Sequence, residues 1–323
     1  MPNRPDRSLA QMKSLESLLP SLRLRSKIQN RVVVSEPWGV LFPPLSKAGM
    51  LHFMEFGRGV LEVPGFPPVL MEQGDFAIVF AESSHAVHDV GGSEPRPLDE
   101  LMKKADVICR TGLTLRFGGT GKEASVLTGD FQFADSANHP IWRLLPPYIL
   151  LRGEDGQAVD WIDTTLSLLS REAMDARAGM TTVLDRLCDV LFIQALRGWV
   201  RTDLAEDGLA AAVRDPAIDE ALDRMQRFPQ NAWTVESLAA HVALSRSSFA
   251  DRFRRLTGET PIEYLTHWRM HLATQSLAEG QASTATVAEE VGYESEAAFA
   301  KAFKRTVGVS PGAFRRGARS GML

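Results

Sequence analysis

The spacing of hydrophobic residues divides the chain into stretches of different texture. In residues 31–134, short apolar runs are separated by Gly, Pro and Ser, a pattern typical of a sandwich or small barrel of many short strands. These runs are RVVVS, WGVLF, MLHFMEF, GVLEV, DFAIVF, LTLRFGG and ASVLTGDFQF. From Asp160 to Arg201 the apolar residues return at helical spacing, and they predict a helical hairpin with DARAG as its joint.

A further pattern occurs twice in the last hundred residues, from Leu238 to Tyr264 and from Val287 to Phe314. Its first apolar positions recur after 49 residues and its later Ser, Phe, Gly and Pro positions after 50, so the second copy has one extra residue in its turn. Each copy predicts two short helices joined by a turn. One copy alone would suit an ordinary helical bundle equally well. Two copies favour DNA binding, because one chain can then hold two helices against one duplex.

Both copies share the same helix-ending residues. In each, a Ser is expected to cap the second helix, two Phe residues to face the core, a Gly to end the helix and a Pro to begin the next one. They are Ser245, Phe249, Phe253, Gly258 and Pro261 in the first copy, and Ser295, Phe299, Phe303, Gly308 and Pro311 in the second.

Between the copies, PIEYLTHWRMHLATQSLAEG is predicted to be one uninterrupted helix. A helix of about 17 residues is roughly 26 Å long. It would be a rigid spacer of about the size needed to set two recognition helices one duplex turn apart, ~34 Å.

The stretch from about Asp215 to Arg316 resembles the DNA-binding domain of the AraC/XylS family of bacterial transcription regulators, including its closing motif, here Gly292 to Pro311. The resemblance implies double-stranded promoter DNA and RNA polymerase as partners. The implied DNA-binding residues are Ser245, Arg246, Ser247, Ala250, Asp251, Arg254, Ser295, Glu296, Ala297, Ala300, Lys301 and Lys304.

Two residues depart from that family's pattern. Asp251 stands where many relatives carry a basic or amide side chain; a carboxylate can accept a hydrogen bond from cytosine N4, but phosphates repel it. Ala243 takes a turn position where Gly is usual, which costs about 1 kcal/mol if the turn is left-handed.

The segments WGVLFPP, MLHFMEFGRGVLEV and LMEQGDFAIVFAESSHAVHD resemble the cupin-type sensor domain often found ahead of this module, and residues 139–151 resemble its close. Trp38, Phe42, His52 and His85 are candidate lining residues for a small organic effector, or else they fill the core. Cupin barrels often hold a metal on three His and one Glu. Met54 stands in the second place of the expected His-x-His pair, so neither a metal nor another cofactor is expected.

A two-His metal site completed by Glu55 or Glu62 remains conceivable. His88 is three residues after His85 and would face the other side of the sheet if both lie on one strand.

Composition adds limits. No apolar run approaches 18 residues and no signal-peptide core is present, so we expect a cytoplasmic protein without a membrane span. Two Cys residues are too few for a disulfide scaffold or a zinc site. The net charge is −4, but the segment from Asp215 onward holds 13 basic and 13 acidic residues. Basic residues gather on or after the expected recognition helices, at Arg252, Arg254, Arg255, Lys301, Lys304, Arg305, Arg315 and Arg316.

These observations predict an α+β two-domain protein. Residues 1–155 would form a cupin-like, effector-binding β-barrel, residues 156–213 a helical dimerisation hairpin and linker, and residues 214–323 an all-α domain with two helix-turn-helix motifs. The expected function is a homodimeric, sequence-specific transcription regulator rather than an enzyme, because the sequence shows no carboxylate pair, nucleophile elbow or Walker loop. One alternative is a metal-dependent enzyme or metal sensor fused to a DNA-binding unit; another is a barrel that serves only oligomerisation.

Overall fold

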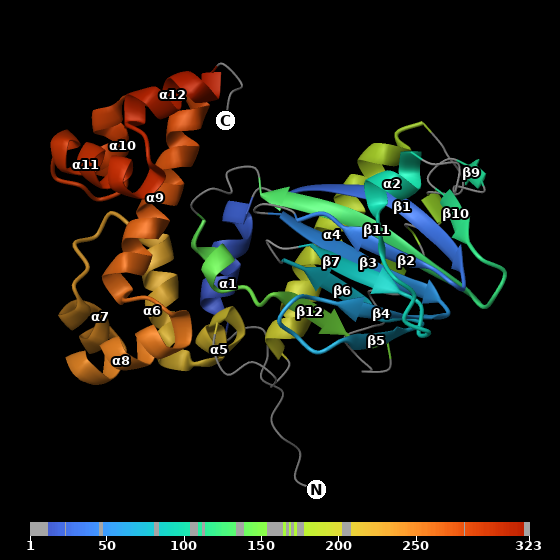
Figure 1. Cartoon of the computed structure of the whole chain (residues 1–323). Helices are drawn as coiled ribbons and strands as arrows, with labels where there is room; N and C mark the ends of the chain where they lie inside the picture. The colour runs from blue at the N-terminus through green and yellow to red at the C-terminus, as the bar shows by residue number, and fades with distance from the viewer. Residues whose placement is uncertain are drawn as a thin grey trace, which may run out of the picture. The chain divides into compact units, whose positions relative to one another are not determined.

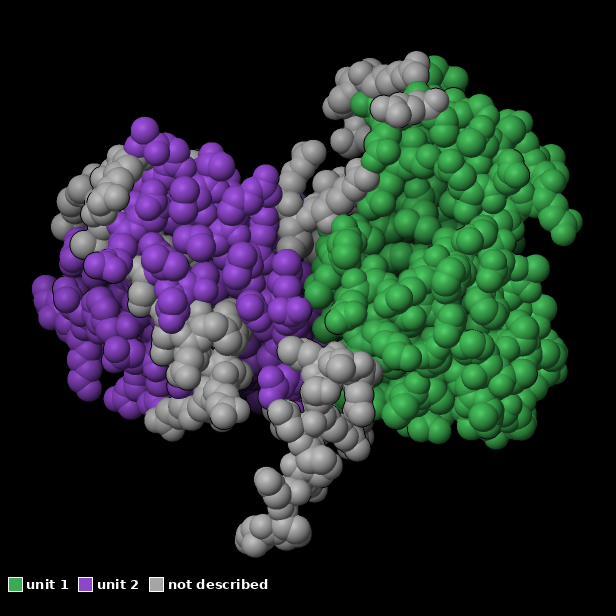
Figure 2. Space-filling view, turned by 180° about the vertical axis from the view of Figure 1, so that it is seen from behind, with its two compact units in different colours: residues 1–23, 134–145, 202–323 green, residues 24–133, 146–201 purple. Residues whose placement is uncertain are grey.

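The structure is a computed structural model that describes residues 12–319 apart from short gaps at 23, 45–47, 81–83, 104–108, 112–113, 134–138, 154–163, 166–167, 169–170, 173–177, 202–207 and 281. The chain forms two compact units (Figure 1, Figure 2). The strand unit comprises residues 24–133 and 146–201, and the helical unit comprises residues 1–23, 134–145 and 202–323.

Two sheets make up the strand unit in the described part of the chain. The first has the order β12-β6-β3-β11-β1-β10-β9 and the second the order β5-β4-β7-β2-β8. The first sheet consists of β1 (Leu24–Ser35), β3 (Ala48–Phe56), β6 (Phe76–Val79), β9 (Cys109–Thr111), β10 (Thr114–Gly118), β11 (Glu123–Phe133) and β12 (Tyr148–Leu151). The second consists of β2 (Gly39–Phe42), β4 (Arg58–Glu62), β5 (Val69–Glu72), β7 (His85–His88) and β8 (Arg96–Pro97), which is followed by helix α2 (Leu98–Lys103).

The core of the strand unit combines side chains from both sheets. Val40 and Phe42 of β2 belong to the same buried apolar cluster as Met50 and Met54 of β3. Helix α4 (Met180–Arg201) packs on the first sheet, and the ring of its Phe192 lies 4.6 Å from that of Phe131 in β11. A strand covered on both faces can be apolar throughout, which explains why β3 is buried over seven consecutive residues.

The expected strand runs are confirmed, since they lie in β1, β2, β3, β4, β6, β10 and β11. β5, β7, β8, β9 and β12 were not among them, because each has only two to four residues, too few to show an alternating pattern. Helix α4 confirms the second half of the expected hairpin, whereas Trp161 and much of the first half lie outside the described residues.

The helical unit contains the duplicated motif. Its described helices are α1 (Lys13–Leu18), η2 (Leu19–Leu22), η4 (Pro140–Arg143), α5 (Gly208–Arg214), α6 (Pro216–Arg227), α7 (Val235–His241), α8 (Arg246–Thr257), α9 (Pro261–Glu279), α10 (Thr284–Glu290), α11 (Glu296–Val307) and α12 (Pro311–Arg319). Figure 1 shows α9 running from α6–α8, called here the first lobe, to α10–α12, the second lobe.

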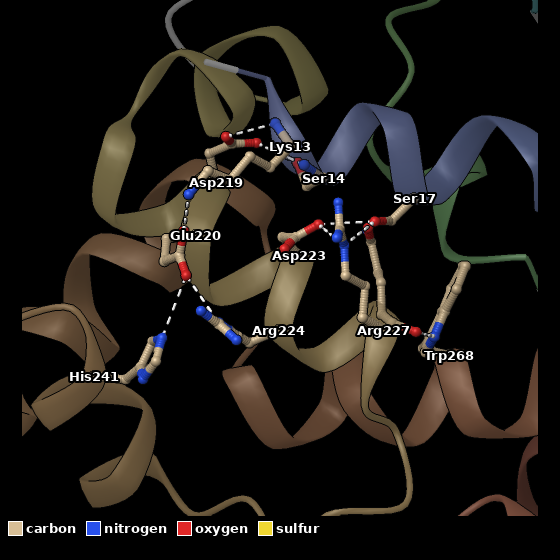
Figure 3. A network of polar contacts seen from close by, with 11 residues as sticks. Lys13, Ser14, Ser17, Asp219, Glu220, Asp223, Arg224, Arg227, His241 and Trp268 are labelled. Atoms are coloured by element: carbon tan, nitrogen blue, oxygen red, sulfur yellow. Dashed lines mark hydrogen bonds and ion pairs between the residues drawn. The ribbon is translucent and has the colours of Figure 1, made fainter. Parts of the chain in front are cut away.

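Helix α1 belongs to the helical unit although its residues come from the start of the chain. It has no side-chain cap of its own; the carboxylate of Asp219 in α6 instead accepts hydrogen bonds from the backbone N–H groups of Lys13 and Ser14, at 2.9 and 3.1 Å. Asp223 accepts a bond from the Ser17 hydroxyl (Figure 3). The compact units therefore divide the chain differently from the consecutive segments 1–155, 156–213 and 214–323.

The segment 139–145 also belongs to the helical unit. The buried His139 side chain accepts a bond from the backbone of Ile141 and lies 2.9 Å, Nε2 to Oγ, from Ser21. Its ring packs against that of His271 in α9, with centroids 4.2 Å apart. Residues 139–151, which resembled the close of the sensor domain, thus split between η4 in the helical unit and β12 in the strand unit.

Candidate nucleic-acid interface

The first lobe contains a helix-turn-helix formed by α7 and α8. The Ser245 hydroxyl caps α8 by accepting a bond from the Ser248 backbone N–H at 3.2 Å. Phe249 and Phe253 are fully buried and hold one face of α8 against the lobe. The opposite face carries exposed polar side chains, among them Arg246, Asp251 and Arg254.

The second lobe repeats this construction with α10 and α11. Ser295 caps α11 through the Ala298 N–H at 3.2 Å, and Phe299 and Phe303 are fully buried. Left-handed glycines end both helices, Gly258 with φ of 78° and Gly308 with φ of 92°. Pro261 begins α9 and Pro311 begins α12. The expected caps, core pairs and helix ends are confirmed in both copies.

The twelve predicted DNA-binding residues lie on or just before α8 and α11, away from the Phe pairs. Ten of them are exposed, and Ala250 and Ala300 are half-buried. The exposed ones are Ser245, Arg246, Ser247, Asp251, Arg254, Ser295, Glu296, Ala297, Lys301 and Lys304. Their exposure meets the first requirement for contact with bases and phosphates, and their individual roles stay predictions.

The turns of the two motifs differ by one residue. The Leu244 N–H donates to the backbone carbonyl of Ala239, and the Tyr293 N–H donates to that of Ala288. Leu244 and Tyr293 therefore occupy matching positions in the two motifs. The extra residue is therefore Glu294, just before the cap. Ala243 has a φ of 55° where the second copy has Gly292 with a φ of 80°, so the expected left-handed turn is confirmed at a residue with a β-carbon.

Two arginines near the first recognition helix have carboxylate partners. Arg246 forms an ion pair with Glu236 of α7, and both side chains are mostly exposed. Arg252 binds Asp215, 2.5 Å away, whose carboxylate also caps α6. Through this ion pair Arg252, one of the basic residues expected on the recognition helices, ties α8 to the start of α6. Sequence reasoning missed Asp215 as its partner, although an Asp just before a Pro is a recognisable helix cap.

Helix α9 connects the two helix-turn-helix motifs as one continuous, rod-like helix. It extends over 19 residues, which corresponds to roughly 28 Å, and Thr260 and Glu263 form a capping box at its start. The uninterrupted helix predicted between the copies is confirmed.

The four effector candidates lie in the core of the strand unit. His52 and His85 face each other with Nε2 atoms 2.8 Å apart, and the Phe42 ring stacks on His85 at 5.1 Å. Trp38 is 5% exposed. Burial lowers the pKa of His85 to about 4. The pKa of His52 also falls well below its usual 6.5, through burial and then through the neighbouring His85.

These histidines do not fit the metal set of a cupin. Glu55 binds Arg31 and the Ser125 hydroxyl, and Glu62 lies 3.3 Å from His88 rather than from the His52–His85 pair. Nitrogens that share a metal are each about 2.0–2.1 Å from it, whereas these two are at hydrogen-bond distance from each other. Within the described residues, no group of three or more His, Cys, Asp or Glu side chains is placed to hold a metal.

A pocket of about 530 Å³ opens beside Trp38 in the strand unit. Its walls include Arg96, Leu101 and Phe117 together with backbone at Gly118 and Gly119. Of the four effector candidates, Trp38 contributes to this lining, while the other three are packed in the core. In the part of the chain that is described, no helix has the length and apolar character needed to span a membrane.

Comparison with known proteins agrees with this architecture. A family described as "Cupin" matches residues 14–201, and one described as "Helix-turn-helix domain" matches residues 238–317. A putative AraC-like transcription regulator of Streptomyces antibioticus is 32% identical over 94% of this chain and 99% of its own. An HTH-type transcriptional regulator of Haemophilus influenzae is 36% identical, with coverage of 94% and 99%.

The chain belongs to the AraC-like transcription regulators. It is a DNA-binding regulator of this family with an N-terminal cupin-like region. The solved DNA-binding domain of AdpA in complex with a target DNA is also similar to it, with 33% identity, a TM-score of 0.32 and coverage of 33% of this chain and 96% of that one.

Proposed function

We propose that this AraC-like regulator reads promoter DNA with both motifs at once, α8 and α11 entering successive major grooves of one duplex. The observation that carries the proposal is the presence of two identically capped recognition helices, each with an exposed polar face, at the two ends of α9. The length of α9, roughly 28 Å, is close to one duplex turn of ~34 Å, which supports the placement of both recognition helices on one face of the DNA.

Selection from randomised duplexes with the full-length protein tests this proposal. Two base blocks about one helical turn apart are expected in the selected sequences. Scrambling either block should lower affinity, and scrambling both should leave salt-sensitive, non-specific binding. Selection of a single block would reject two-groove reading.

We also propose that a small organic effector binds in the strand unit at the pocket beside Trp38, with Phe42, His52 and His85 as the buried wall behind it. The pocket volume lies within the ~300–1,000 Å³ range of small-molecule sites, and aromatic and cationic side chains line it. In a thermal-shift screen, a stabilising compound whose effect is lost in Trp38→Ala but kept in Trp233→Ala, a change in the helical unit, would support this site. The competing proposals are a metal-dependent enzyme or sensor, favoured by a stoichiometric metal in the purified protein, and an oligomerisation body, favoured by the absence of any stabilising compound.

Helix α4 is the proposed dimer contact. Val183 and Val190 are 43% and 42% exposed and lie seven residues apart, on one face of the helix. A second copy of the chain would cover this stripe. Val190→Glu should convert a dimer to a monomer in sedimentation experiments, whereas Val190→Leu, which keeps an apolar side chain on the same stripe, should not. In this proposal RNA polymerase is the protein partner at the promoter, and effector binding alters which dimer and linker geometry is preferred.

A further inference from the structure

One arginine in the middle of α9 contacts both lobes of the DNA-binding region. Arg269 is the only arginine of this helix. Its Nε donates to the backbone carbonyl of Pro229 and its Nη2 donates to that of Asn231, both at 2.8 Å. Pro229 and Asn231 belong to the loop between α6 and α7, so these two bonds tie the rod to the first lobe.

The same guanidinium also lies over a side chain of the second lobe. The Arg269 Cζ atom is 5.6 Å from the centre of the Tyr293 ring, a cation–π arrangement. Tyr293 lies in the turn between α10 and α11, and its ring contacts that of Phe299 on α11 at 5.7 Å. The arginine therefore reaches, through one aromatic ring, the core side of the second recognition helix.

The two lobes also approach each other at this point. A β-carbon added at Gly292 would lie 2.7 Å from the carbonyl oxygen of Gln230 and equally close to the Arg269 guanidinium. Gly292 precedes Tyr293 in the second turn, and Gln230 stands between the two residues whose carbonyls Arg269 binds. A residue without a side chain is what allows the turn of one motif to pack on the loop of the other.

This junction matters because a helix alone fixes distance better than orientation. Long helices curve and bend, and each lobe packs on only part of α9. To meet two grooves together, the readers must also keep a fixed angle about the rod.

We propose that Arg269 is the positioning residue that holds the two recognition helices in one mutual orientation, by binding the α6–α7 loop of the first lobe and the Tyr293 turn of the second. Its planar fork donates along two directions while its face lies on a ring, a combination that Lys does not offer. The proposal rests on two-groove reading, and it adds that the coupling between grooves passes through this one side chain as well as through the rod.

A measurement without DNA tests the positioning itself. Spin labels are placed on the two lobes by Ala240→Cys in the first and Glu289→Cys in the second, both exposed positions, in full-length protein with Cys109→Ser and Cys188→Ala. Pulsed dipolar spectroscopy should give one narrow distance distribution with native Arg269 and a broad one with Arg269→Ala. An equally narrow distribution in both proteins would overturn the inference, whatever the DNA experiments show.

The matched control is Trp233→Phe. The Trp233 indole donates to the Phe228 carbonyl at 2.9 Å, in the same α6–α7 loop but without a described contact to the second lobe. This variant should keep the narrow distribution. Arg269→Lys keeps a positive charge and the aliphatic stem, so it serves as the second variant if Arg269→Ala does not fold, as judged by circular dichroism, and it should broaden the distribution to a smaller extent.

A binding experiment then connects positioning to function. The probe is a duplex selected by the wild-type protein, beside versions with one base block scrambled. Linked sites gain about 10²–10⁴-fold over single sites when geometry is right. Arg269→Ala should lose about tenfold or more of that gain while its affinity for the single-block duplexes stays at the wild-type value. An equal loss on all duplexes would overturn the inference, and failure of the wild type itself to prefer two blocks would instead reject two-groove reading.

Discussion

The two helix-turn-helix motifs share one scaffold but carry opposite charges at two matched positions. Counting along the recognition helices, Arg246 of the first corresponds to Glu296 of the second, and Asp251 corresponds to Lys301. The caps, the Phe pairs and the terminal glycines are the same in both. Duplication thus preserved what folds the motif, while the exposed face diverged. The two readers are therefore expected to select different bases.

Their turns differ as well. The second motif has the additional Glu294 and a glycine at its left-handed position, whereas the first has Ala243 there. The second turn packs against the other lobe through the half-buried Gly292, whereas Ala243 of the first turn is exposed. The motifs are therefore unequal in structural role: the second turn is built into the junction, and the first carries its strained residue at an exposed position.

Gly292→Ala is the change expected to have the largest effect. The added β-carbon would overlap the Gln230 backbone. The alanine would also have to adopt the left-handed backbone conformation that Gly292 has, with a φ of 80°. Strain and overpacking together should lower the free energy of unfolding by about 2–4 kcal/mol, measured by urea denaturation. Stability equal to wild type would mean that the two turns are equivalent.

Lys301→Ala tests the difference in base reading. If this exposed lysine contacts a base edge, its loss should cost about 1–3 kcal/mol of discrimination at one base pair. Binding to a panel of single-base variants of the selected duplex measures this. Arg246→Ala should relax a different base pair, in the block read by the first motif. If both variants relax the same position, or if all duplexes weaken equally, the assignment of separate reading roles is wrong.

Arg254→Ala tests a feature that the motifs share, since Lys304 occupies the matching position. Loss of one phosphate contact should weaken binding to all sequences alike. It should also reduce the slope of log affinity against log salt concentration by about 1. Lys304→Ala should behave in the same way. Titrations at several salt concentrations give the slope, and a change confined to one base pair would argue for base contact instead.

Ala243→Gly should have the smallest effect and the opposite sign to Gly292→Ala. Glycine adopts a φ of 55° without a steric penalty, but it also increases the entropy of the unfolded chain. The net gain is expected to be about 0.5–1 kcal/mol, visible as a higher midpoint in urea. A loss of stability would show that the Ala243 methyl group makes contacts that outweigh the strain.

Much of the DNA-binding region could be predicted because its signals are local. The cap at Ser245, the Phe249–Phe253 pair and the glycine at 258 each act over a few residues along one helix, and the second copy repeats them. The strands β1, β2, β3, β4, β6, β10 and β11 were predicted from their apolar runs for the same reason. The strand β8 and the helix α1 were missed because their own residues carry no comparable pattern.

Of the candidate sites, the DNA-binding face could be predicted from the sequence, whereas the grouping of residues in the strand unit could not. The exposed face of each recognition helix follows from helical periodicity once the buried Phe residues are known. The grouping of Trp38 with a pocket lined by Arg96 and Phe117 depends on which strands pair, and the packing of His52 on His85 depends on how the two sheets face each other. Strand pairing and sheet packing bring together residues that are tens of positions apart, and no spacing rule covers them.

By itself, the sequence determined the local elements, the duplication and the family to which the chain belongs, because periodicity and helix caps are interactions between near neighbours. Only the tertiary structure decided that Asp219 caps a helix 206 positions earlier, that residues 13–22 and 139–145 join the DNA-reading unit, and that Arg269 joins both lobes. Such contacts follow from the path of the whole chain, because a hydrogen bond recognises the position of its partner in space and not its place in the sequence.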